Sequence, residues 1–181
     1  MRESELRRLV QLMKKNDGRA FEDFFNLLYP RFYRYAYLYI KSDVLCEELV
    51  SDVFMKLWNI RHKLNEIKQL EFYLFRAVKN QTMTYLKRNS SQPQEISDYF
   101  QSNLVEYKQP ENLLINAELA RIIEEAVSRL PDKCQVVFRL VREDMLSYKQ
   151  VAVLLDISTK TIENQMNTAL KKLRKVIADY Y

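Results

Sequence analysis

Glycine is nearly absent from this 181-residue chain, which contains one glycine, at position 18. Rossmann and P-loop nucleotide sites need several glycines, because their backbone must approach phosphate groups closely. The composition therefore excludes both kinds of site. Only four prolines accompany the glycine, and hairpin-rich β folds depend on turn residues with positive φ. The chain is instead rich in Leu, Lys, Glu, Arg and Ala, which favour helices, so we expect an all-α fold.

Cysteine and histidine are also scarce. Cys46 and Cys134 lie far apart in the sequence, and the single histidine, His62, is near neither of them. A disulfide framework or a zinc site needs more ligands at closer spacing, so we expect no metal and no cofactor. Two unpaired thiols suit a reducing compartment. The start of the chain has mixed charge, and no apolar run approaches the ~20 residues that span a bilayer, so a cytoplasmic protein without a transmembrane segment is expected.

What the chain does contain is a succession of amphipathic helical patterns separated by turn residues. The first half predicts a helix at 4–15, one that begins after Asp17, one at 43–60 with Asp43 as its N-cap, and one at 69–88. Pro30 should begin a new helix or kink the old one. The second half predicts helices at 113–130, from Pro131 to about 143, from a capping box at 147–150 to 155, and from 159 to about 179 with Ser158 as its cap.

The segment between the two halves has a different character. It contains two prolines, no clear hydrophobic period, and four acidic residues against one lysine, Lys108. A connection of this length inside one compact domain would be unusual, and the composition is typical of a linker. We therefore predict two small helical bundle domains, at 1–89 and 113–181, joined by a flexible acidic linker at 90–112.

A helix-turn-helix is predicted from Tyr148 to about Ala169. Ala152 is small where two crossing helices must approach closely, and Asp156 tolerates the left-handed backbone of a tight turn. The second helix begins with a polar outer face that could read base edges, made of Thr159, Lys160, Glu163, Asn164 and Asn167. Basic residues that suit phosphates follow, namely Lys171, Lys172, Arg174 and Lys175. The alternative is an ordinary helical hairpin with a solvated charged face, but the coincidence of these features favours DNA binding.

The net charge of +5 is unevenly distributed, and the stretch from Phe72 to Gln94 contains bases but no acidic residue. Its aromatic residues alternate with those bases, a combination that suits a nucleic-acid strand with unstacked bases. The helical period favours Phe72 and Phe75 as core residues and leaves Tyr73 and Tyr85 as candidates for exposure. The alternative, in which the aromatics are core and the bases are a solvated face, remains open.

The predicted helix at 43–60 has more apolar residues than a core-facing stripe needs. Phe54, Met55 and Trp58 extend beyond that stripe and are flanked by the charged residues Asp52, Lys56 and Arg61. Exposed aromatics with a charged rim often mark a protein interface. A helix buried on two sides in a bundle would explain the same pattern.

The segment Cys46–Trp58 resembles the polymerase-binding signature of the extracytoplasmic-function sigma factors, within the sigma-70 superfamily. Residues 72–88 are similar to that family's promoter-melting helix. Leu130–Pro131, Ser147–Tyr148, Ser158–Thr161 and Leu170–Arg174 are similar to parts of its C-terminal domain. Family members commonly have Asp, Gln and Asp where this chain has Glu48, Ser51 and Thr84.

The resemblance implies a sigma factor that binds the RNA polymerase core and directs promoter recognition, DNA melting and transcription initiation. Domain 1–89 would be region 2, contacting the polymerase through Glu48, Asp52, Phe54, Leu57 and Trp58. It would contact the minus-ten element through Arg76, Lys79, Asn80, Thr84, Lys87 and Arg88. Domain 113–181 would be region 4, contacting the minus-thirty-five element through Ser158, Thr159, Lys160, Thr161, Glu163, Asn164, Asn167, Lys171, Lys172 and Arg174. The linker would pass through the polymerase interior, and an anti-sigma factor is a further expected partner.

Two other classes of protein fit the sequence less well. A helix-turn-helix regulator that is not a polymerase subunit, of the response-regulator type, would need an N-terminal α/β receiver, but residues 1–89 show helical periods and no strand alternation. An enzyme would need a catalytic constellation. His62 has no nucleophile beside it, and Glu47 and Glu48 are adjacent and so point in different directions on a helix, so we expect no enzymatic activity.

Overall fold

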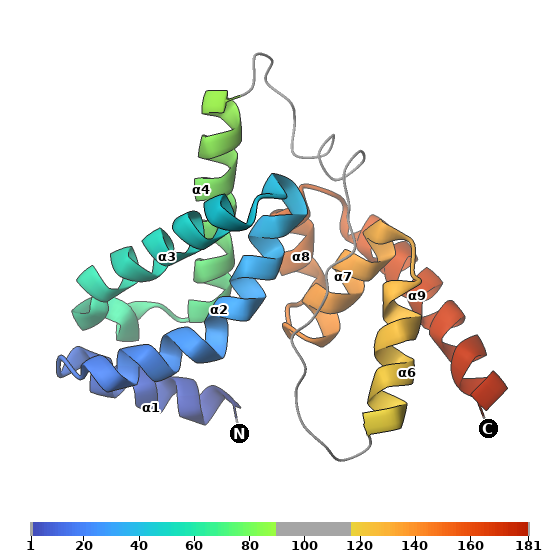
Figure 1. Cartoon of the computed structure of the whole chain (residues 1–181), viewed down its shortest axis with the longest axis horizontal. Helices are drawn as coiled ribbons and strands as arrows, with labels where there is room; N and C mark the ends of the chain where they lie inside the picture. Colours follow the sequence, from blue (N-terminus) through green and yellow to red (C-terminus); the bar gives the residue numbers. More distant parts are fainter. Residues whose placement is uncertain (1, 90–116, 181) are drawn as a thin grey trace. The chain divides into compact units, whose positions relative to one another are not determined.

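The computed structural model describes residues 2–89 and 117–180, and every regular element in these ranges is a helix (Figure 1). The chain divides into two compact units, Met1–Gln94 and Glu95–Tyr181. The whole of the predicted linker at 90–112 and the start of the helix predicted at 113–130 lie outside the described residues. Because residues 2–89 form helices only, they do not contain the α/β receiver that a response regulator would require.

The first unit is built around one long helix, α2, which packs against three others. Its elements are α1 (Arg2–Lys14), α2 (Gly18–Ile40), α3 (Asp43–Asn59), the 3-10 helix η1 (Arg61–Glu66) and α4 (Leu70–Asn89). The predicted helices of this half are present with boundary shifts of one or two residues, as is usual for helix ends. The 3-10 helix η1 was not predicted, because its six residues are too few to show a helical period.

Helix α2 begins where the sequence predicts it. The Asp17 carboxylate accepts hydrogen bonds from the backbone N–H groups of Arg19 and Ala20 at 3.0 and 3.1 Å, which satisfies two donors of the first turn. Pro30 does not begin a new helix, because α2 continues through it to Ile40. Figure 1 shows α2 changing direction along its length, as expected when a proline removes one backbone hydrogen bond.

The N-cap of α3 is Ser42, so the prediction of Asp43 was wrong by one residue. Ser42 has an extended backbone, and Asp43 is already helical. The Asp43 carboxylate instead accepts a hydrogen bond from the Tyr33 hydroxyl on α2. An acidic group in the first turn still complements the positive end of the helix, so the sequence signal was real although the cap position was not.

The second unit contains the remaining described helices, α6 (Ala117–Ser128), α7 (Asp132–Arg142), α8 (Tyr148–Leu155) and α9 (Thr159–Tyr180). Pro131 is the N-cap of α7 rather than its first residue. Ser147 and Gln150 form the predicted capping box, since each side chain accepts a hydrogen bond from the other residue's backbone N–H. A core of small and medium residues joins α6, α7 and α9, made of Ala126, Val127, Leu130, Cys134, Ala169 and Leu173.

Among the described residues, the helices are all too short or too polar to cross a membrane.

Candidate nucleic-acid and protein interfaces

The turn between α8 and α9 has the geometry that the sequence predicts for a helix-turn-helix. Asp156 adopts a left-handed backbone with φ 56° and ψ 46°, a conformation that Asp tolerates better than most residues. The N–H of Ile157 then donates to the carbonyl of Ala152 at 3.1 Å. Ser158 Oγ accepts from the N–H of Thr161 at 3.0 Å, which caps the start of α9.

Helix α9 has one buried stripe and one polar face. Ile162, Met166 and Ala169 are fully buried, and their spacing of four and three residues places them on one side of the helix. Most of the predicted DNA-contacting residues of α9 are exposed, namely Thr159, Lys160, Glu163, Asn164, Asn167, Lys171, Lys172 and Arg174, together with Ser158 just before it, while Thr161 is half-buried. The helix therefore presents a polar N-terminal half and a basic C-terminal half to solvent.

Three residues of that face, Lys160, Glu163 and Asn164, already have partners within α9. Lys160 Nζ forms an ion pair with Glu163 Oε2 at 2.9 Å, and both side chains are exposed. Surface pairs of this kind contribute little to stability, so either partner could leave the pair to bind another group at low cost. Thr168 Oγ1 donates to the carbonyl of Asn164 at 2.9 Å, which leaves the Asn164 amide outside that bond.

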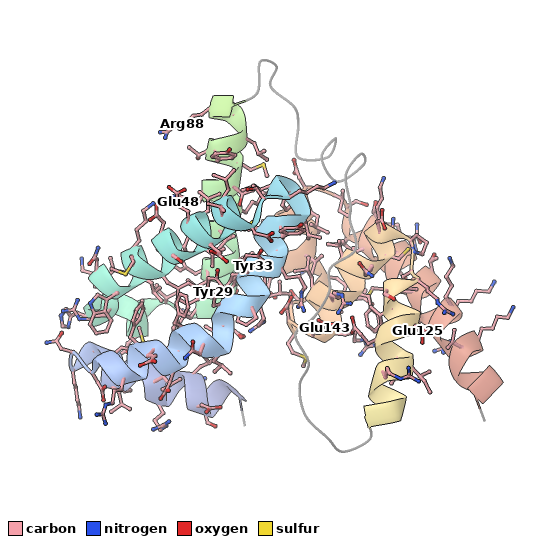
Figure 2. The ribbon with its side chains drawn as sticks, viewed as in Figure 1. Tyr29, Tyr33, Glu48, Arg88, Glu125 and Glu143 are labelled. Carbon is pink, nitrogen blue, oxygen red and sulfur yellow. The ribbon has the colours of Figure 1, made fainter. Side chains whose placement is uncertain are left out.

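Helix α4 presents a second outward face. Leu74, Phe75 and Val78 are fully buried, whereas a stripe of residues three or four apart is exposed, made of Tyr73, Arg76, Asn80, Thr84 and Lys87. Arg88 is also exposed, near the C-terminal end of α4 (Figure 2). Among the predicted contacts, Lys79 is half-buried, and the Thr84 hydroxyl donates to the Asn80 carbonyl at 2.8 Å.

The aromatic residues of α4 follow the prediction from the helical period in part. Phe75 is buried and Tyr73 is 41% exposed, so the expectation for these two residues is confirmed. Phe72 and Tyr85 are both half-buried. One exposed aromatic side chain therefore lies beside the exposed polar stripe of α4.

The predicted polymerase contacts all lie on helix α3, but they differ in their exposure to solvent. Glu48 and Asp52 are exposed, and Glu48 projects from the ribbon of α3 in Figure 2. Trp58 is half-buried. Phe54 and Leu57 are only 1% and 2% exposed, so the interpretation of Phe54 as an exposed interface residue was wrong.

The burial of Phe54 has a clear cause in the packing of α2. Its ring contacts the rings of Phe24, Phe25, Tyr29 and Phe32, with ring centroids 4.9 to 6.5 Å apart, within the range of favourable aromatic pairs. Phe54 therefore belongs to the main aromatic core of the first unit, where α2 supplies four of its ring neighbours. For this residue, the alternative of a helix buried on two sides was the better one.

Each unit also contains a buried arginine that the sequence did not single out. Arg31 on α2 pairs with Glu71 on α4 and lies over the Phe75 ring, with Cζ 5.7 Å from its centroid. Arg139 on α7 pairs with Glu124 on α6 and with Glu143, whose carboxylate is 2.7 Å away. Both arginines lie at apolar-stripe positions of their helices. The helical period of the sequence predicts that these two positions face the core. It does not predict which acidic residue forms the ion pair with each arginine.

The two cysteines are in surroundings that disfavour the thiolate. Burial raises the pKa of the Cys46 thiol to about 11, and burial likewise raises the pKa of the Cys134 thiol. Cys134 Sγ donates a hydrogen bond to Gln165 Oε1 at 2.8 Å. Thiols with raised pKa values are poor nucleophiles and metal ligands, which fits structural roles for both residues.

Comparison with known protein families finds two matches along the chain. The family description "Sigma-70 region 2" matches residues 24–92, and "Sigma-70, region 4" matches residues 120–173. The first contains α3, α4 and most of α2, and the second contains the helix-turn-helix. Together the two matches include every predicted contact residue except Arg174, which directly follows the second match.

Similar proteins with curated names include two sigma factors. "ECF RNA polymerase sigma factor SigW" of Bacillus subtilis is 22% identical over 191 residues, covering 98% of this chain and 99% of that protein. "ECF RNA polymerase sigma-E factor" of Escherichia coli K12 is 26% identical over 170 residues, covering 87% of this chain and 86% of that protein.

Similar folds occur in two solved complexes. One is CnrH bound to the cytosolic domain of CnrY, with a TM-score of 0.52, 18% identity, and 97% and 98% of the two chains covered. The other is the sigma factor RpoE of Bartonella quintana bound to the anti-sigma factor NepR, also with a TM-score of 0.52 and 18% identity, and 87% and 96% covered.

Proposed function

The chain belongs to the sigma-70 family and is a sigma factor of the extracytoplasmic-function type, and from this premise we propose how its residues divide the work of initiation. As a sigma factor, it binds the RNA polymerase core and directs transcription initiation at promoter DNA. We assign residues 1–89 to region 2, residues 90–112 to a linker and residues 113–181 to region 4. We assign no catalytic step to the chain itself.

The first unit contacts the polymerase core through the outer surface of α3. The exposed carboxylates of Glu48 and Asp52 and the half-buried indole of Trp58 are available to a partner. Phe54 and Leu57 are buried in the hydrophobic core of the first unit, where their packing holds α3 in position. An interface that combines acidic groups with an aromatic anchor suits a basic or polar partner surface.

Helix α4 contacts the minus-ten element. Its exposed stripe contains Arg76, Asn80 and Thr84, with Lys87 and Arg88 at the C-terminal end. The basic side chains suit phosphates, and Asn80 suits the edge of a base that has left the duplex. Tyr73 offers an exposed ring on which such a base can stack.

Helix α9 reads the minus-thirty-five element in the major groove. The observation that carries this proposal is its polar face, which is exposed opposite the buried stripe of Ile162, Met166 and Ala169. Lys160, Glu163 and Asn164 in its first half suit base edges. Lys171, Lys172 and Arg174 in its second half suit phosphates.

An anti-sigma factor is a further partner that we propose for this chain. Support comes from the solved relatives, one of which is titled as a sigma factor with the anti-sigma factor NepR and another as CnrH with the cytosolic domain of CnrY.

The decisive test is transcription by purified core polymerase on a pool of genomic DNA fragments, with and without this protein. New start sites that appear only with the protein are expected. Asp52→Lys should abolish these start sites while leaving DNA binding by the second unit intact, and Glu66→Lys, an equal charge change at an exposed residue of η1, should not. Equal transcription by the two variants would contradict the assignment of α3 to polymerase binding.

A further inference from the structure

Arg61, the first residue of η1, makes three separate contacts around Trp58. Its Nε donates to Asn16 Oδ1 at 2.7 Å, and its Nη1 donates to the backbone carbonyl of Trp58 at 2.9 Å. Its Cζ lies 4.5 Å from the centroid of the Trp58 ring, inside the range of a cation–π interaction. The guanidinium therefore touches both the backbone and the side chain of the same tryptophan.

Trp58 has a further neighbour on α2. The Phe21 ring lies with its centroid 5.0 Å from that of Trp58, at an interplanar angle of 48°. Trp58 nevertheless remains half-buried rather than fully buried. The indole is thus in contact with Phe21 and Arg61 while part of its surface remains open to solvent.

The arrangement restricts the rotamers of a side chain that remains accessible. Binding partners gain affinity when an interface side chain is ordered before association, because less conformational entropy is lost on binding. The Asn16 contact extends the restraint to the loop between α1 and α2, where Asn16 has a left-handed backbone with φ 67°. Arg61 is therefore itself held by groups outside α3.

We propose that Arg61 is a positioning residue that presents the Trp58 indole to the polymerase core. The inference rests on the proposed role of Trp58 in polymerase binding and assigns to Arg61 no contact with the polymerase. An arginine suits this position because its planar guanidinium can stack on a ring and donate two hydrogen bonds at once, whereas a lysine has no plane to stack and a single charged nitrogen.

Trp58 is the only tryptophan of the chain, so its environment can be observed directly. Protein labelled with 5-fluorotryptophan gives one fluorine resonance, both free and bound to unlabelled core polymerase. The variants to compare are Arg61→Met, Arg61→Lys and, as the matched control, Lys63→Met, which removes the same charge from an exposed neighbour in η1. Trp58→Ala tests the underlying docking role.

Arg61→Met should weaken core binding about three- to tenfold, the size expected when one interface side chain must be ordered on binding, and should shift or broaden the resonance of the free protein. Arg61→Lys should fall between Arg61→Met and the unsubstituted protein, and Lys63→Met should leave both measurements unchanged. Thermal unfolding of each variant shows that it is folded before binding is compared.

Two results would overturn the inference separately from the docking role. If Trp58→Ala weakens binding while Arg61→Met binds as the unsubstituted protein does, Trp58 docks without help from Arg61. An unchanged fluorine resonance in Arg61→Met would likewise show that Arg61 does not position the ring. If Trp58→Ala itself binds normally, the docking role of Trp58 fails and the inference fails with it.

Discussion

At the residue scale, Thr82 on α4 is fully buried in the first unit. Among the residues that the structure describes, no group forms a hydrogen bond with its hydroxyl oxygen. A buried hydroxyl without a partner costs free energy, whereas a methyl group of the same shape does not. Thr82→Val should therefore raise the free energy of unfolding by about 1 kcal/mol.

Urea denaturation measures this change, and Thr84→Val is its control. The Thr84 hydroxyl is exposed and bonded to the Asn80 carbonyl, so its replacement should change stability little. A clear loss of stability in Thr82→Val would mean that the hydroxyl has a partner in solution.

Cys46 gives a prediction about alkaline pH. Its pKa is raised from 9.0 to about 11 by burial, so between these values the folded protein keeps a proton that the unfolded chain loses. Stability from this group is therefore intact below pH 9 and is lost as the pH rises toward 11, with a slope of at most about 1.4 kcal/mol per pH unit.

Urea midpoints at pH 8, 9, 10 and 11 should fall less steeply above pH 9 in Cys46→Ala than in the unsubstituted protein. Some decline will remain, because burial also raises the pKa of Tyr39 to about 12. Identical slopes in the two proteins would rule out a contribution from Cys46.

At the element scale, α9 separates residues that should read sequence from residues that should bind any DNA. Asn164→Ala should weaken binding to the minus-thirty-five element by about 1–3 kcal/mol and relax the preference for one base. Lys171→Ala should weaken binding to all sequences alike and reduce the salt slope by about one. Titrations of labelled promoter and unrelated duplex at several salt concentrations distinguish the two.

The two variants serve as controls for each other, since both side chains are exposed on the same helix. An equal loss on promoter and unrelated DNA in Asn164→Ala would mean that this residue contacts the backbone. If Lys171→Ala loses affinity for the promoter but not for unrelated DNA, residues in the second half of α9 also contact bases.

Helices and their ends were the elements that sequence predicted best. The capping box at Ser147 and Gln150, the start of α2 after Asp17 and the turn at Asp156 each depend on groups within a few residues, so local chemistry suffices to predict them. Pro30 is the contrast. Whether a proline ends a helix or bends it depends on what the following turns pack against, and here buried Phe32 and Tyr35 keep those turns in the core.

At the scale of the whole molecule, the division into Met1–Gln94 and Glu95–Tyr181 predicts that each half folds by itself. Fragments 1–94 and 95–181 should each unfold cooperatively, and the sum of their helix contents should match that of the intact chain. Mixed together, they should support promoter-directed transcription at least tenfold more weakly, because the linker no longer raises the effective concentration of one half near the other.

Circular dichroism and run-off transcription check these two expectations. A fragment that is unfolded alone but helical in the mixture would show that the halves stabilise each other. Full activity of the mixed fragments would show that covalent connection contributes nothing to initiation.

The sequence by itself determined the all-helical class, most helix boundaries and the polar face of α9. These features follow from hydrophobic period and capping, which act between residues three or four apart. The family resemblance likewise needed only the order and spacing of short segments, and the matches to regions 2 and 4 bear it out.

Only the tertiary structure decided which apolar face of α3 is buried. Phe54 and Trp58 are four residues apart and equivalent by period, yet Phe54 is enclosed by rings from α2 while Trp58 remains partly open beside Arg61. The ion pairs of Arg31 and Arg139 were decided in the same way, by acids on other helices. Burial depends on which neighbours surround a residue in three dimensions, and a one-dimensional period has no information about neighbours distant in the chain.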